Sequence, residues 1–399
     1  MSTIKVAHIG DVHFSDKHLE EVDKVMNSTI DYLGDHPPQL IVIPGDTFDH
    51  KLEQNSPALF AAIEAVSRLA NIAPTLIMQG TLSHDAPRAI NIFNSIQAAN
   101  EIYVVDTVCQ VVLRNGVFGL LASTGSLDAD VLISCLPSVN KGEIAAVFGA
   151  DNAGRAAGVQ VADLLKSWAP SHLAARGAGV PTIFMTHGTV SGSVTEHGCV
   201  MAGLDWEMTS GIVFASEASA GMINHIHKHQ SWESQDGKRR IAYPGSLGRY
   251  HFGEQGDKGF LVWDVSHDSA TFDFIVTPAK QLLEVTFTGT PDMEALAKVA
   301  REAPIGAHVR IRYSVDEEHR TSVDKEAIAK LFGAHRECKI EGSINPVQRQ
   351  RSAGISKVVD LNTQLVQWAA LTESNAAPLI DRLALAQSSS VDAILAAMA

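Results

Sequence analysis

Aspartate and histidine residues gather at five points of this 399-residue chain, each directly after a short apolar run. In chain order they are Asp11 and His13; Asp46, Asp49 and His50; Ser83, His84 and Asp85; His187; and His225, His227 and His229. Carboxylates and imidazoles without cysteine suit a catalytic Mn²⁺, Fe²⁺ or Zn²⁺ ion better than a structural zinc ion. The set is too large for one tetrahedral ion. It favours two ions that share a carboxylate, clamp phosphate oxygens and generate hydroxide for in-line attack.

Each of these points has a simpler interpretation when it is taken alone. A histidine at a strand end is commonly a hydrogen-bonded loop residue, and the aspartate of "GD" can cap the next helix. The run Ser83, His84 and Asp85 invites comparison with a serine hydrolase. A nucleophilic serine needs a histidine base that reaches it across space, however, and adjacent loop residues rarely point that way. An ordinary turn and the edge of a metal site are the readings that remain.

Three short apolar segments must position the first of these side chains. The segments "IKVAHIG", "QLIVIPG" and "PTLIMQG" are typical of buried strands, and apolar residues recur at helical spacing between them. The alternation predicts a parallel sheet with right-handed crossovers, and ligands gather at the carboxyl ends of such strands. We therefore expect Asp11, His13, Asp46 and His84 to share one crevice.

The rest of the chain predicts further strands and two smaller regions. After residue 100 the pattern is strand-rich, with one Ala-rich helical stretch near 156–176. This indicates an α/β fold in which two sheets face each other with helices outside. Composition shifts at about residue 278. We predict a first domain over 1–278, a small α+β domain over 279–350 and a helical tail over 351–399.

An apolar stripe marks the predicted tail. Its members fall on one helical face, with polar residues opposite: Val358, Leu361, Leu365, Trp368 and Leu371. The stripe either packs on the small domain or docks a partner by helix-in-groove contact.

Bulk composition narrows the class of protein. The formal net charge is −14, so any DNA contact needs a local basic patch or metal ions. The four cysteines are scattered without CxxC spacing, which favours a reducing compartment. No signal peptide precedes the first strand pattern, and no apolar run reaches membrane-spanning length. We expect a cytoplasmic protein without membrane contact.

The order of the motifs, D-x-H, GD, H-D, H and H-x-H, resembles that of the calcineurin-like metallophosphoesterases. The segment "NHIHKHQ…RRIAYPGSLGRYHFGEQGDKGFLVWDV" is similar to the "GHIHK…YPGS…FGE…KGF" segment of the SbcD-type nuclease subunits of bacteria and phages. The resemblance covers roughly residues 1–350 in order and spacing. It implies a four-layer α/β/β/α metallophosphoesterase sandwich with a small α+β capping domain and a helical C-terminal tail.

The resemblance also implies a role for each matching residue. His84 is the catalytic histidine, which protonates the leaving 3′ oxygen or stabilises the transition state, and Asp85 orients its ring. Two divalent metal ions are bound, with Mn²⁺ preferred over Fe²⁺, Zn²⁺ or Mg²⁺. Asp46 bridges the two ions, and the remaining ligands are Asp11, His13 and His227 for the first and His187 and His225 for the second. His50, His229 and His251 are left as supporting or surface residues, and Asp49 as a residue that orders its loop.

Two positions depart from the family pattern. The family usually has "GNHD", with the Asn carbonyl on the second metal, whereas this chain has "GTLSHD". We expect the hydroxyl of Ser83, a backbone carbonyl or a water held by Thr81 to replace the amide, and the second metal to bind more weakly. The glycine of "GHIH" is Asn224 here, and Asn is the usual substitute for Gly at positive φ.

The resemblance implies a DNA exonuclease or endonuclease subunit that works in DNA repair or recombination. Its partners are DNA and an SbcC-type ATPase bound through the C-terminal helices, in a heterotetramer built on a homodimer. Candidate DNA contacts are Lys228, Arg249, Arg310 and Arg312, with Lys238, Arg239 and Arg240 nearby. A solvated strand face is the alternative for Arg310 and Arg312.

Two other functions remain open. The same metal core serves small-molecule phosphodiesterases and phosphoprotein phosphatases, because fold and site support many phosphoesters. A degenerate scaffold that only binds a partner is the non-enzymatic alternative, and the missing Asn is its one support.

Overall fold

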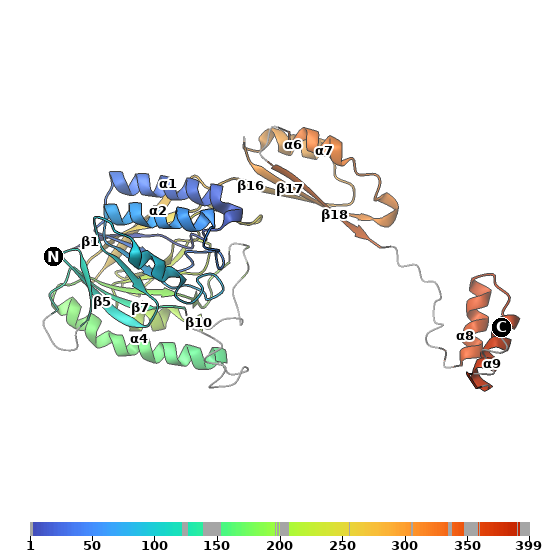
Figure 1. Ribbon diagram of the computed structural model, residues 1–399, viewed down its shortest axis with the longest axis horizontal. Coiled ribbons are helices and arrows are strands. Elements are labelled where there is room, and N and C mark those ends of the chain that lie inside the picture. The colour runs from blue at the N-terminus through green and yellow to red at the C-terminus, as the bar shows by residue number, and fades with distance from the viewer. Residues whose placement is uncertain are drawn as a thin grey trace. The chain divides into compact units, whose positions relative to one another are not determined.

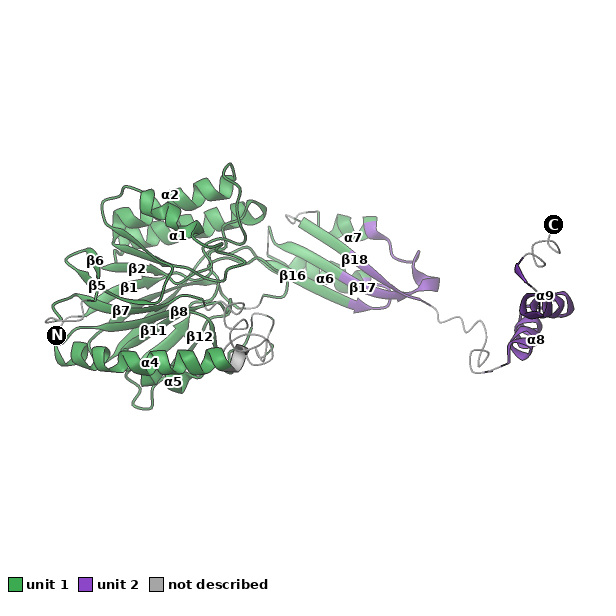
Figure 2. Cartoon of the chain, turned by 60° about the horizontal axis from the view of Figure 1, so that its bottom comes forward, with its two compact units in different colours: residues 1–286, 293–311, 326–340 green, residues 287–292, 312–325, 341–399 purple. Residues whose placement is uncertain are grey.

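A computed structural model describes residues 3–121, 127–138, 153–195, 197, 199, 207–254, 256–304, 306–333, 337–346, 358, 360–388 and 390–391. The chain divides into two compact units, one of residues 1–286, 293–311 and 326–340 and the other of residues 287–292, 312–325 and 341–399 (Figure 2). The first unit carries every predicted metal ligand.

Two facing β-sheets form the centre of the first unit. The six-stranded sheet has the order β15-β14-β1-β2-β3-β4, in which β1 to β4 run parallel and β14 and β15 antiparallel. Its strands are β1 (Ile4–His8), β2 (Leu40–Ile43), β3 (Thr75–Met78), β4 (Ile102–Val105), β14 (Gly259–Val265) and β15 (Ala270–Val276). The predicted parallel start of the fold is confirmed.

The second sheet has seven strands in the order β12-β13-β11-β8-β7-β5-β6. Strands β7, β8, β11 and β13 are parallel, and β12, β5 and β6 pair antiparallel at the two sides. They are β5 (Cys109–Arg114), β6 (Val117–Leu120), β7 (Val131–Leu136), β8 (Thr182–His187), β11 (Ala220–Asn224), β12 (Gln230–Glu233) and β13 (Arg240–Tyr243). A short pair, β9 (Thr189–Val190) and β10 (Glu207–Met208), follows β8.

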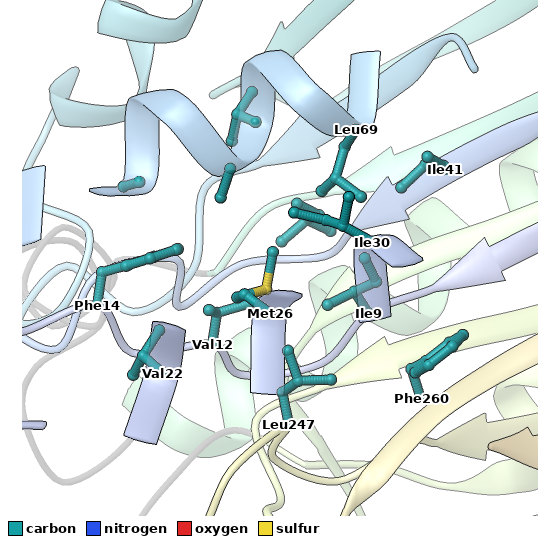
Figure 3. Close-up of a cluster of buried hydrophobic side chains, with 14 of the residues drawn as sticks. Ile9, Val12, Phe14, Val22, Met26, Ile30, Ile41, Leu69, Leu247 and Phe260 are labelled. Carbon is teal, nitrogen blue, oxygen red and sulfur yellow. The ribbon is translucent and has the colours of Figure 1, made fainter. Parts of the chain in front are cut away.

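Helices cover the outer face of each sheet (Figure 1). α1 (Leu19–Asp35) and α2 (Pro57–Ile72) pack on the six-stranded sheet, and the buried cluster between them includes Met26, Ile30 and Leu69 (Figure 3). α4 (Ala153–Gly177) and α5 (Ser210–Ala215) cover the seven-stranded sheet. A third apolar cluster fills the space between the sheets. The predicted α/β/β/α sandwich is therefore confirmed.

The sequence explains where the first helices begin. Ser56 caps α2, accepting a hydrogen bond from the Leu59 amide at 3.4 Å, and Pro57 occupies the first helical position. Asp16 reinforces this start, because its carboxylate accepts from the Ser56 hydroxyl at 2.7 Å and from the Ala58 amide at 2.9 Å. The contact ties the 3₁₀ turn before α1 (Asp16–His18) to the start of α2.

The region after 278 holds a three-stranded sheet of β16 (Leu282–Thr288), β17 (His308–Asp316) and β18 (Glu337–Asn345) in the order β16-β17-β18. Each strand contributes residues to both compact units. Helices α6 (Met293–Glu302) and α7 (Lys325–Leu331) belong to the same region. A 3₁₀ turn (Glu317–His319) follows β17.

The predicted helical tail contains α8 (Leu361–Leu371) and α9 (Ala377–Ser388). Asp360 caps α8 by accepting from the Thr363 amide at 2.8 Å, so Val358 lies outside the helix and not on its stripe. Leu361, Trp368 and Leu371 are exposed. Among the described residues, no helix is long and apolar enough to cross a membrane.

Candidate metal centre

The predicted ligands stand on loops at the carboxyl ends of strands from both sheets. Asp11 and His13 follow β1, and Asp46 follows β2. Backbone hydrogen bonds join these two loops, from the His13 amide to the Asp46 carbonyl at 3.1 Å and from Phe14 to Thr47 at 2.9 Å. The other sheet contributes three histidines. His187 is the last residue of β8, and His225 and His227 follow β11.

Four candidate ligands have backbone conformations that L-residues rarely adopt. The φ angles are 31° at Asp11, 53° at His13, 50° at Asp46 and 120° at His225. Such strain persists only where the surroundings impose it, and it concentrates at functional sites. The expectation that Asn224 adopts positive φ is wrong, because Asn224 is the last residue of β11 and the strained residue is His225.

Close backbone approach explains the glycines of "GD" and "GT". A Cβ atom on Gly80 would lie 2.1 Å from the Asp46 amide nitrogen and 2.3 Å from its Oδ1. Gly45, at φ +102°, would place a Cβ atom 2.6 Å from His187 Nδ1. Any side chain at either position would displace Asp46 or His187, so these glycines bring the two loops together.

Asp11, His13 and His227 form the first cluster. One ligand atom of each lies within 4.8 Å of the others. The Nε2 atoms of His13 and His227 face each other at 3.0 Å. Asp11 is held by the His225 amide, which donates to both of its carboxylate oxygens at 3.2 Å.

Asp46, His187 and His225 form the second cluster on the same criterion. His187 Nε2 lies 3.2 Å from Asp46 Oδ2, and its Nδ1 lies 3.0 Å from the Pro44 carbonyl. A donor bond from Nδ1 to this carbonyl fixes the ring and leaves Nε2 for the cluster. Asp46 Oδ2 also lies 4.0 Å from His13 Nε2, so Asp46 stands between the two clusters, as its predicted bridging role requires.

His84 lies beside both clusters, and a residue other than Asp85 orients its ring. His84 Nε2 is 4.0 Å from Asp46 Oδ2, and Nδ1 contacts the backbone carbonyl of Asp49. The buried Asp85 carboxylate instead accepts from the amides of Phe48 at 3.0 Å and Gly80 at 2.9 Å. The role predicted for Asp85 is therefore corrected. Asp85 joins two loops, because buried amides need an acceptor, and Asp49 orients His84.

Electrostatics prepare the ligands for a cation. Burial lowers the pKa of His13 to about 4 and that of His227 well below its usual value, so both rings are neutral at pH 7. Burial opposes ionisation of Asp46, but the neighbouring His187 holds the pKa of that carboxyl well below its usual range. Burial alone would lower the pKa of His187, and the Asp46 carboxylate raises it to about 9. Metal binding needs neutral imidazoles, which His13 and His227 supply, whereas His187 must release its proton when an ion binds.

The donor set fits divalent ions. Two imidazole nitrogens about 2.1 Å from one ion and at right angles would be about 3.0 Å apart, the separation of the His13 and His227 Nε2 atoms. Facing Nε2 atoms cannot both donate, whereas one cation satisfies both. His/Asp clusters of this kind could hold metal ions, and mixed imidazole and carboxylate ligands suit Mn²⁺, Fe²⁺ or Zn²⁺.

The hydroxyl group that contacts the second cluster belongs to Thr81. Its Oγ1 lies 3.2 Å from His187 Nε2 and 3.5 Å from Asp46 Oδ2, while its amide donates to Asp46 Oδ1 at 2.7 Å. Ser83 is exposed. Of the predicted substitutes for the family amide, the structure thus favours Thr81 over the Ser83 hydroxyl. The signal was present in the sequence, since Thr81 directly follows Gly80 as Asn follows Gly in "GNHD".

Asn224 links the two sheets behind the first cluster. With its amide oriented to satisfy both neighbours, its nitrogen donates to His8 Nε2 at 2.9 Å and its oxygen accepts from the Asp11 amide at 3.2 Å. His8 is fully buried, and burial lowers its pKa to about 3, so the ring is neutral. Sequence reasoning treated Asn224 as a backbone substitution and missed this bridge, which only the facing of β1 and β11 creates.

Two further supports of the site were also missed. The Tyr250 hydroxyl donates to the Val12 carbonyl, and its ring centroid lies 5.7 Å from that of His13. Lys258 is buried, pairs with Glu254 at 2.6 Å and donates to the His227 carbonyl at 2.9 Å. A buried lysine needs such a partner, and here the pair holds the loop that carries His227.

The predicted DNA contacts differ in burial and in the groups that surround them. Arg249 is buried, and its guanidinium donates to the carbonyls of Lys280 at 2.7 Å and Gly256 at 2.5 Å. It is a structural residue, because a guanidinium enclosed by two carbonyls does not reach a phosphate.

The other candidate DNA contacts differ in how closely acidic side chains pair with them. Arg310 pairs with Glu284 and lies over the Phe252 ring at 4.6 Å. Arg312 is more open, with Glu341 at 3.9 Å, and Lys228 is half-buried. Lys238, Arg239 and Arg240 pair with Asp268, Glu217 and Glu233.

The three histidines predicted as supporting or surface residues belong to none of the ligand clusters. His229 stacks on Phe274 at 4.6 Å, and its Nδ1 lies 2.7 Å from the Tyr243 carbonyl. His50 and His251 are exposed, and His50 lies beside Asp49.

Comparison with known proteins agrees with this architecture. No protein family model matches the chain. The chain is 22% identical over 268 residues to a protein of Invertebrate iridescent virus 6 named "Putative phosphoesterase 244L". The match covers 66% of this chain and 76% of the viral protein. The similarity supports a phosphoesterase-type fold for the chain, in keeping with its two facing sheets and its His/Asp clusters.

Proposed function

We propose that this chain is a two-metal-dependent DNA exonuclease or endonuclease subunit that hydrolyses phosphodiester bonds at DNA ends. The observation that carries the proposal is the position of Asp46, which faces His13, His84 and His187 within 4.0 Å. One carboxylate between two ligand clusters suits a pair of ions that act together in phosphoester hydrolysis. The name of the viral relative supports the hydrolase class, and the motif resemblance supports DNA as the substrate.

The chain's own residues divide the work of the reaction. Divalent ions, when bound, supply Lewis acidity and a hydroxide nucleophile at neutral pH. Asp11, Asp46 and the four ligand histidines would hold the two ions that contact the reacting phosphate. His84 directs Nε2 toward the cluster while its Nδ1 contacts the Asp49 carbonyl, which fixes the orientation of the ring. His84 thereby gives a proton to the leaving 3′ oxygen.

We further propose that residues 279–350 orient DNA over the site and that residues 351–399 dock an SbcC-type ATPase. Of the four candidate DNA contacts, Lys228 and Arg312 remain for phosphate once the enclosed Arg249 and the Glu284-paired Arg310 are set aside. Support for the docking role comes from the exposed side chains of Leu361, Trp368 and Leu371 on α8. Deletion of 355–399 should abolish capture of the ATPase subunit while metal-dependent nuclease activity is retained, and unchanged capture would contradict the docking role.

A small-molecule or protein phosphoesterase is the second candidate. The observation in its favour is a small basic surface. Arg249 is buried against backbone carbonyls and Arg310 is paired with Glu284, so neither side chain is open to DNA phosphates. Linear DNA and a cyclic nucleotide, each offered with Mn²⁺, separate the two functions. The proposal expects DNA to be degraded and the cyclic nucleotide to be spared.

A further inference from the structure

A cavity of about 270 Å³ adjoins the His84 side chain. Two neighbouring segments line it, the loop from Phe48 to the start of α2 and the turn from Ala86 into the 3₁₀ helix Ala89–Ser95. Its volume is just below the usual range for drug-sized ligands, so a single ring system suits it better than a larger molecule. None of the predicted metal ligands lines the cavity.

The walls of the cavity are apolar and firmly held. Phe48 is buried and stacks on Phe93, with ring centroids 5.8 Å apart and an interplanar angle of 16°. Leu52, Leu59 and Ile92 add to the apolar lining, and Ile92 is 36% exposed. A flat apolar ring is the ligand group that such walls accept.

The cavity also carries two exposed cations and no described acidic residue. Lys51 and Arg88 line it, and neither side chain forms an ion pair or hydrogen bond within the described part of the chain. Arg88 has φ 65°, a conformation that residues other than glycine adopt uncommonly. Two exposed cations that line one cavity, in a chain of net charge −14, indicate an anionic ligand.

We propose that this cavity binds the unstacked nucleobase of the nucleotide whose 3′ oxygen leaves, with Lys51 and Arg88 on its flanking phosphate. The inference rests on the proposed nuclease function. His84 lines the cavity and also lies 4.0 Å from Asp46, so a base held there places its own 3′ oxygen near the ring that protonates it. A base in the cavity has left its duplex stack, so the preferred substrate is single-stranded or frayed DNA.

Two oligonucleotides that differ only at the leaving nucleotide test the inference, one with a base and one with an abasic residue there. With Mn²⁺, the native protein should cleave the base-bearing strand with about tenfold higher kcat/KM. Ile92→Trp, which fills the cavity, should abolish this preference. Val159→Trp, on the exposed surface of α4, is the matched control and should keep it.

A binding measurement in EDTA gives a readout independent of turnover. An oligonucleotide with 2-aminopurine at the leaving nucleotide should brighten on binding the native protein, because the base unstacks, and should not brighten with Ile92→Trp. Equal cleavage of both strands by the native protein, with no brightening, would overturn the cavity assignment and leave the nuclease proposal standing. Cleavage of neither strand would overturn the nuclease proposal and this inference with it.

Discussion

Nε2 of His13 lies 3.0 Å from Nε2 of His227, although the two residues are 214 positions apart in the chain. One ring follows β1 of the six-stranded sheet and the other follows β11 of the seven-stranded sheet. Burial holds the pKa of both rings below its usual value, so neither repels the other as a cation. The contact therefore depends on the facing of the two sheets, and it places two neutral nitrogen donors where one cation can accept both.

His84→Ala should abolish turnover without loss of metal. His84 groups with His13 and Asp49 but belongs neither to the Asp11, His13 and His227 cluster nor to the Asp46, His187 and His225 cluster. Loss of a proton donor costs roughly 10²–10⁴-fold in kcat. Phosphodiester hydrolysis and isothermal calorimetry with Mn²⁺ measure the two properties. His36→Ala, an exposed histidine at the end of α1, is the control and should retain kcat. Loss of metal binding in His84→Ala would show that His84 is a ligand.

Thr81→Asn should tighten the weaker of the two metal sites. Thr81 stands against His187 and Asp46 where the related family has an amide, and a missing ligand-shell group typically costs ~10–100-fold in affinity. In the native chain, activity should rise with Mn²⁺ in two phases, and the second phase should move to lower Mn²⁺ in Thr81→Asn. Ser83→Ala should change neither phase. A larger effect of Ser83→Ala than of Thr81→Ala would reverse the assignment.

Asn224→Gly should weaken both the fold and the first metal site. The glycine leaves the buried His8 ring and the Asp11 amide without their partner, at a cost of about 1–3 kcal/mol in the free energy of unfolding. Urea denaturation in EDTA measures this cost, and Mn²⁺ titration should show roughly tenfold weaker binding. Asn115→Gly, at an exposed turn with φ 50°, is the control. Native stability and affinity in Asn224→Gly would remove Asn224 from the site.

His172 should make the fold sensitive to acid. It lies between Ser134 Oγ at 2.7 Å and the Ser216 carbonyl at 2.6 Å, and burial lowers its pKa to about 4. The unfolded chain binds this proton near pH 6.5. The stabilisation of about 3 kcal/mol is therefore complete above pH 6.5 and lost as the pH falls toward 4.

Replacement of His172 by glutamine tests this sign. His172→Gln should flatten the dependence of the unfolding free energy on pH between 6.5 and 4, measured by urea denaturation. His36→Gln, at the exposed end of α1, should retain the native slope. The same slope in His172→Gln as in the native chain would assign the acid sensitivity to other groups.

The sandwich could be predicted from the sequence because the patterns that indicate its strands and helices are local. Apolar strands alternate with amphipathic helices from β1 to β3, and this pattern needs no knowledge of distant residues. The ligand residues could be found for the same reason, since each follows a strand and parallel strands end at one edge. The glycines at 45 and 80 belong to the same local signal.

What could not be predicted depends on contacts between distant segments. The family resemblance implied that Asp85 orients His84, yet its carboxylate accepts from amides that include Phe48, in the loop after β2. Arg249 was expected at the surface because it is charged, yet carbonyls near positions 256 and 280 enclose it. The Asn224 bridge exists only because β1 and β11 face each other. Composition and motif spacing do not predict such contacts between distant segments.

Release of nucleotides from labelled linear DNA by the purified chain is the direct test of two-metal nuclease activity. We expect degradation that requires Mn²⁺, stops with EDTA and is absent in Asp46→Asn, whose amide cannot serve as the bridging carboxylate. A cyclic nucleotide should remain intact under the same conditions. Intact DNA alongside hydrolysis of the cyclic nucleotide, or full DNA degradation by Asp46→Asn, would contradict the account.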